Sequence, residues 1–290
     1  MTVSVATRLM IVNVSISQWE GRRLDKAITR KTIDDNQVQD ADGLRVNKLL
    51  IERDAFKEMT AAASSIRTFL RERTLPWKDN GDRALMRQGY QLFMQDFYKL
   101  EQDWHAAVDH FITTKYPAAR AKASFNLGDA YDPEDYPHPE ELRTRFKLTL
   151  DIDAVAEAGD FRVKLDEDVV SEIKEKIEEA MAQRIQNAMS DVWARVATMV
   201  EHYADRTKPD IQRFHDTTVT NLQGLVGLMP SLNLLGDPNL KALAARLKDT
   251  LCSYDPKDLR KNPDVRASAC ADAQAIMDDM QGFMQAFKSN

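Results

Sequence analysis

Cysteine is scarce in this chain, where Cys252 and Cys270 are the only two among 290 residues. Two thiols so widely spaced cannot form a disulfide framework or a thiolate zinc site, and they fit a reducing compartment. Long apolar runs are also missing, because no stretch approaches the roughly 18 apolar residues that a membrane-spanning helix needs. The first residues lack the basic, apolar and small-residue layout of a signal peptide. We therefore expect a cytoplasmic protein without membrane association.

Glycine and proline are few, with ten of each, and the prolines fall mainly in short clusters. Such spacing is typical of long helices that are joined by infrequent turns. With 43% hydrophobic and 30% charged residues, the composition is that of a folded chain, long enough for one large domain or two small ones. We therefore predict a mainly α-helical fold.

An overall excess of positive charge is absent, since the formal net charge is -6. That balance disfavours a dedicated surface for duplex DNA, which needs an excess of Lys and Arg to neutralise phosphates. The first 78 residues nevertheless carry 14 basic and 10 acidic side chains, a net of +4. Their densest basic run is a candidate contact for nucleic acid or for an acidic surface on a neighbouring subunit. It comprises Trp19, Arg22, Arg23, Lys26, Arg30 and Lys31.

Familiar catalytic motifs are missing too, because no phosphate-binding loop, dinucleotide fingerprint or Gly-x-Ser-x-Gly elbow occurs in the sequence. His105 and His110 share a predicted helix, but five residues turn them about 140° apart, so they cannot bind one metal together. The acidic residues of 172–179 lack the histidines of a di-metal site, and the acidic loop of 128–139 lacks the calcium-loop pattern. We therefore expect no enzymatic activity, no catalytic residue, no cofactor and no metal.

One stretch of about forty residues, 166–206, contains neither Gly nor Pro. Its apolar residues recur every three or four positions, which predicts a single helix about 60 Å long with one buried stripe. A compact core cannot bury a helix of that length, so other long helices must run beside it. Residues 44–73 and 82–115 show the same periodicity. We predict an elongated bundle of long antiparallel helices.

Alternating apolar residues predict three strands, at 10–17, 146–152 and 161–165. Two strands alone are marginally stable, so we expect all three to form a small antiparallel sheet at one end of the bundle. Residues 1–210 would then hold the bundle and the sheet. Residues 211–290 would form C-terminal helices packed on the bundle, at about 210–228, 238–253 and 263–288.

Five short segments form a combination that is more specific than any one of them. They are Trp19-Glu20-Gly21-Arg22 after a predicted strand, Thr74-Leu75-Pro76-Trp77 with Gly81, Asp135-Tyr136-Pro137, Asp160-Phe161-Arg162-Val163, and Asn221 with Asn233 near paired leucines. From about residue 8 to residue 250, the chain resembles a family of uncharacterised proteins found mainly in bacteriophages and prophages. Members are often encoded near MoxR-type AAA ATPases and von Willebrand type A domain proteins. The resemblance implies a phage origin, a multiprotein assembly and the cytoplasm of a bacterial host, and it transfers no catalytic residue.

The leading functional hypothesis is a non-enzymatic helical scaffold or adaptor that oligomerises or docks to an assembly containing an AAA ATPase. Long helices with extended side surfaces and the lack of catalytic motifs both favour it. An accessory DNA-binding protein of phage replication or recombination, acting through the basic run of 22–31, is one alternative. A helical membrane-active protein of the pore-forming kind is another, because residues 225–235 are markedly apolar.

Overall fold

The computed structural model describes residues 5–157 and 167–288, and it confirms that the chain is mainly helical. The chain divides into two compact units. Unit 1 contains Met1–Asn13, Leu70–Phe93 and Asp151–Asn290, and unit 2 contains Val14–Phe69 and Met94–Leu150. The predicted division at residue 210 does not coincide with these units, because the helix that ends there packs against helices that follow it.

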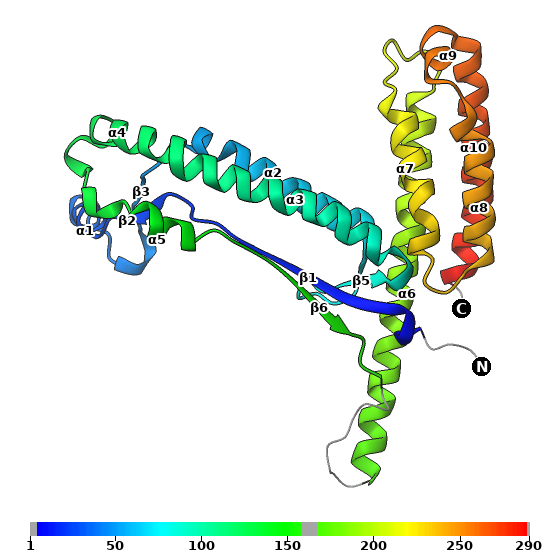
Figure 1. Ribbon diagram of the computed structural model, residues 1–290, viewed down its shortest axis with the longest axis horizontal. Coiled ribbons are helices and arrows are strands. Elements are labelled where there is room, and N and C mark those ends of the chain that lie inside the picture. Colours follow the sequence, from blue (N-terminus) through cyan, green and yellow to red (C-terminus); the bar gives the residue numbers. More distant parts are fainter. Residues whose placement is uncertain (1–4, 158–166, 289–290) are drawn as a thin grey trace. The chain divides into compact units, whose positions relative to one another are not determined.

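That helix is α6 (Glu167–Arg206), which confirms the single helix expected from the absence of Gly and Pro. It packs against α7 and α10 of the same unit (Figure 1). The expected flanking by residues 44–73 and 82–115 is not confirmed, and within unit 1 the C-terminal helices α7 and α10 pack on α6. The remaining helices of unit 1 are α7 (Thr217–Leu232), α8 (Pro238–Asp249), α9 (Pro256–Lys261) and α10 (Pro263–Lys288).

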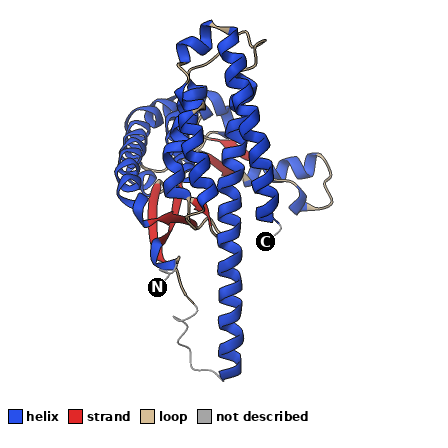
Figure 2. Ribbon diagram, turned by 90° about the vertical axis from the view of Figure 1, so that its right-hand side faces the viewer, coloured by secondary structure: helices blue, strands red, loops and turns tan. Residues whose placement is uncertain are grey.

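The two halves of α6 differ in burial. In the second half, Val192, Val196 and Val200 are fully buried, and Tyr203 donates a hydrogen bond to the carbonyl of Leu251 at 3.1 Å. In residues 167–187 no side chain is fully buried. Figures 1 and 2 show this first half extending past the ends of α7 and α10. Met181 and Ile185 still pack against the core of unit 1, so the stripe beyond the ends of α7 and α10 is its earlier part, with Val170, Ile173 and Ile177 partly buried.

The main sheet has four strands in the order β4-β5-β1-β6, so the predicted three-stranded sheet is wrong. Two of its predicted strands are present, whereas residues 161–165 lie outside the described part of the chain. The missed strands, β4 and β5, form a hairpin around Gly81, whose φ of +93° requires glycine. The strands are β1 (Leu9–Ser17), β4 (Leu75–Pro76), β5 (Arg83–Met86) and β6 (Lys147–Ala154).

Unit 2 is built from shorter pieces than expected. The helix predicted at 44–73 begins at residue 57, because residues 47–49 pair as a strand with residues 22–24. The helix predicted at 82–115 begins only at residue 90. Pro117 does not end the helical structure, because it lies in the first turn of the helix that begins at Tyr116, where proline removes no needed donor. The elements are β2 (Arg22–Leu24), α1 (Lys26–Asp35), β3 (Asn47–Leu49), α2 (Lys57–Arg73), α3 (Tyr90–His110), the π-helical segment Phe111–Lys115, α4 (Tyr116–Leu127) and α5 (Pro139–Thr144).

An aromatic cluster forms part of the core of unit 2. The ring of Phe111 lies 4.9 Å from that of Phe56, 5.6 Å from that of Phe146 and 6.0 Å from that of Tyr116, measured between centroids. Trp19 packs edge-on against Tyr116 at 5.7 Å. Aromatic contacts of this kind add to the free energy that their burial provides.

Candidate functional site

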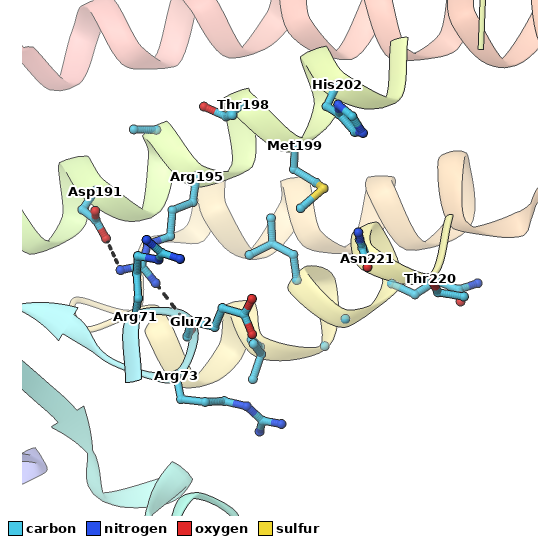
Figure 3. A pocket seen from close by; sticks show the side chains of 16 residues that line it. Arg71, Glu72, Arg73, Asp191, Arg195, Thr198, Met199, His202, Thr220 and Asn221 are labelled. Atoms are coloured by element: carbon cyan, nitrogen blue, oxygen red, sulfur yellow. Dashed lines mark hydrogen bonds and ion pairs between the residues drawn. The ribbon is translucent and has the colours of Figure 1, made fainter. Parts of the chain in front are cut away.

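A groove of about 960 Å³ lies in unit 1, between α6, α7 and the last residues of α2. Small residues line much of it. Ala194 and Thr198 face it from α6, and Gly224 and Gly227 face it from α7, where a Cβ would meet nothing within 4 Å. Met199 points from α6 toward α7 and provides an apolar contact within it (Figure 3). Two helices with such small side chains leave room for a third helix to approach closely.

Arginines form one end of the groove. Arg195 of α6 pairs with Asp191 at 2.5 Å and donates to the carbonyls of Thr74, at 3.0 Å, and Glu72, at 3.4 Å (Figure 3). These carbonyls belong to the C-terminal end of α2 and the residue after it, where helix carbonyls have no partner within the helix and where a cation is favoured. Arg195 therefore has a structural role, which fixes the end of α2 against α6.

Arg83 of β5 supports the same corner of the groove. Its guanidinium donates to the hydroxyl of Thr74 at 2.6 Å and to the carbonyl of Thr74 at 3.0 Å. Burial lowers the pKa of Arg83, and the neighbouring charges of Arg195 and Arg71 lower it further. Positive charge is thus concentrated here, and Arg71 and Arg73 add two more guanidinium groups to the lining. An acidic group of a bound partner would be attracted to this end.

The groove is also lined by polar residues other than arginine. Thr220, one of its hydroxyl residues, donates to the carbonyl of Thr217 on its own helix at 3.4 Å. Across residues 5–157 and 167–288, no group of three or more His, Cys, Asp and Glu side chains is arranged to hold a metal ion. The lining thus combines helix backbone, apolar side chains and a cationic end.

The basic run predicted as a contact site lies in unit 2, and two of its members are already engaged. Trp19 is only 9% exposed because it packs in the aromatic cluster, so it cannot stack on a base. Arg23 pairs with Asp135 at 2.9 Å and donates to the carbonyl of Glu134 at 3.2 Å. Arg23 remains exposed in spite of these contacts, and the other members, Arg22, Lys26, Arg30 and Lys31, are exposed as well. This arrangement does not favour a stacking site for nucleic acid.

The segment is anchored by a network around Lys48. The ammonium of Lys48 lies 2.6 Å from Asp135 and 2.9 Å from Asp25, and it donates to the carbonyl of Ala130 at 3.0 Å. The hydrogen bond with Asp135 raises the pKa of Lys48. The pKa of Asp25 is lowered, mainly by the backbone N–H of Ile28 and then by Lys48. The network therefore holds β2, β3 and the acidic loop together.

We expect the stability of unit 2 to decline at both extremes of pH. The contribution of Asp25 is present above its ordinary pKa of 3.8 and is lost as pH falls through the lowered folded value. The contribution of Lys48 is complete below 10.5 and is lost as pH rises through the raised folded value. Lys48→Met should weaken the alkaline decline and keep most of the acid decline, because Ile28 is the main cause of the low pKa of Asp25.

The measurement is the urea midpoint of unit 2 as a function of pH, in wild type and in Lys48→Met. Loss of the acid decline in this variant would show that Lys48, rather than the N–H of Ile28, controls Asp25.

The sequence gives little sign of the groove. It depends on residues from three separated segments, and only the pair Gly224 and Gly227, three residues apart within a helix, hints at close approach on one helical face.

No protein-family model, curated protein or solved structure matches this chain. Among the helices of the described residues, none is both long and apolar enough to cross a bilayer.

Proposed function

We propose that this protein is a non-enzymatic, phage-encoded helical scaffold or adaptor that oligomerises or docks to a multiprotein assembly in the cytoplasm of a bacterial host. The observation that carries the proposal is the groove between α6 and α7. It has small residues on both walls, an apolar contact from Met199 and arginines at one end. These features suit an amphipathic helix with acidic residues on its flank, which is a recurrent mode of peptide recognition.

Small wall residues favour a helix over a compact ligand. Glycine and alanine let helix backbones approach closely, as in other helix pairs with small residues at their contact. Guanidinium groups suit carboxylates because their planar donors match carboxylate geometry. An acidic, amphipathic helix meets both conditions.

The resemblance suggests which larger assembly is involved. Because proteins of the similar phage family are often encoded near MoxR-type AAA ATPases and von Willebrand type A domain proteins, these are the proposed heterologous partners. An adaptor of this kind would hold an ATPase next to its target without chemistry of its own.

The test is association with and without such a partner. The chain is expressed alone and together with a MoxR-type AAA ATPase, and the mass of the purified species is measured by light scattering. We expect an oligomer, a complex with the ATPase, or both. Gly224→Leu fills the groove without a backbone clash, so it should reduce whichever association occurs. A chain that stays monomeric and binds no ATPase would refute the proposal.

A further inference from the structure

The first half of α6 carries an apolar stripe that extends beyond α7 and α10 of the described residues. Val170, Ile173 and Ile177 are partly buried, Met181 packs against the core of unit 1, and no side chain of residues 167–187 is fully buried. Figures 1 and 2 show this segment, about 30 Å long, extending past α7 and α10. The apolar residues of this segment recur every three or four positions, as the apolar residues of the second half of α6 do.

This stripe and the groove lie on the same face of α6. Residues 18 apart in an α-helix are separated by five whole turns and point in the same direction. Ile173 lies 18 residues before Asp191, and Ile177 lies 18 residues before Arg195. The groove residues Asp191 and Arg195 are therefore in line with the centre of the stripe. One helix face carries both an apolar ridge and a groove.

The charges of the two surfaces are complementary. Residues 167–187 hold six acidic and three basic side chains, a net of -3. The groove is lined by three arginines, Arg71, Arg73 and Arg195, against the two acids Glu72 and Asp191. A stripe with acidic flanks thus matches a groove with a cationic end.

From these observations we infer that the first half of α6 occupies the groove of a second copy of this chain. Because ridge and groove lie on one face of one helix, two copies related by a two-fold axis place each ridge in the other copy's groove, with the α6 helices antiparallel. Such an interface is isologous and closed, since the same patch of each subunit is used and no free surface remains for further addition. The inference rests on the proposed function and names the occupant of the groove.

Two variants test the two surfaces separately. Ile177→Glu places a charge in the stripe, whereas Gly224→Leu fills the groove where nothing lies within 4 Å. We expect wild type to be a dimer at micromolar concentrations and each variant to raise the dimer dissociation constant at least about 30-fold, as for a central contact of an interface. Ala182→Glu is the matched control. Ala182 is exposed and lies five residues after Ile177, about 140° around the helix, so its variant should remain dimeric.

Mixing the two variants gives the sharper result. The Gly224→Leu chain keeps an intact stripe and the Ile177→Glu chain keeps an intact groove, so the mixture should form a heterodimer through one contact while each chain alone is monomeric. This rescue also shows that both variants are folded. A monomeric wild type overturns the inference but leaves the proposed function standing if the ATPase still binds. A dimer that Gly224→Leu leaves unchanged overturns it as well, because the stripes would then be packing on each other.

Discussion

Phe111→Ala is expected to lower the free energy of unfolding of unit 2 by about 3–5 kcal/mol, the usual cost of truncating a buried aromatic residue. Phe111 is 1% exposed, and its ring contacts those of Phe56, Phe146 and Tyr116. These partners come from segments before, after and within the helical stretch that contains Phe111. A cavity at this position therefore weakens several connections of the unit at once.

Hydrogen exchange measured by mass spectrometry is the suitable readout, because it reports the opening of unit 2 peptides separately from those of unit 1. Phe125→Ala is the matched control. Phe125 is 90% exposed on α4, so its truncation should change the free energy of unfolding by less than about 0.5 kcal/mol. Equal effects of the two substitutions would show that the aromatic cluster does not stabilise the unit.

The fold is predictable from the sequence where local pattern decides the outcome. Residues 167–206 form one helix because they lack Gly and Pro and keep a helical apolar period. Residues 263–288 also keep a helical apolar period, with proline at the first position, and they form one helix although they contain Gly282. In both cases the information lies within the segment itself, so no knowledge of neighbours is needed.

Prediction fails where pairing between distant segments decides. Residues 83–86 have a helical apolar pattern but pair as a strand with residues 9–12 and with residues 75–76. The Asn80-Gly81 turn, which joins residues 75–76 to residues 83–86 in a hairpin, resembles the start of a helix. The partners of α6 are a second example. A stripe shows that a helix is covered without showing by which element, and two long helices at 44–73 and 82–115 would satisfy the stripe as well as the C-terminal helices do.

The contact residues show the same limit. Arg23 and Trp19 are residue types that occur in nucleic-acid sites. Their partners Asp135 and Tyr116 lie about a hundred residues away in sequence, and these contacts pair Arg23 with Asp135 and bury Trp19 in the aromatic cluster. The groove residues Arg195 and Gly224 carry no motif. Their proximity follows from the packing of α7 on α6, which periodicity alone does not specify.

Tyr203→Ala is expected to destabilise unit 1 by about 3–5 kcal/mol, since it empties a site in the core of α6 and its neighbours. Tyr203 is 0% exposed, and its hydroxyl donates to the carbonyl of Leu251 at 3.1 Å. Tyr203→Phe keeps the ring and removes only the donor, so it should cost about 1–3 kcal/mol, the penalty of an unsatisfied buried acceptor. The ordering of the two variants separates packing from hydrogen bonding.

The measurement is urea unfolding monitored by hydrogen exchange of peptides from α6, α7 and α10. The control is Glu201→Ala, because Glu201 is exposed and lies two residues before Tyr203 on the same helix. Burial also raises the pKa of Tyr203, so the folded state favours its neutral form. Its contribution is therefore complete below the ordinary tyrosine pKa of about 10 and declines as pH rises above that value. Tyr203→Phe should reduce this alkaline decline in unit 1. A variant with wild-type stability and an unchanged alkaline decline would mean that the hydroxyl of Tyr203 is solvated rather than bonded to Leu251.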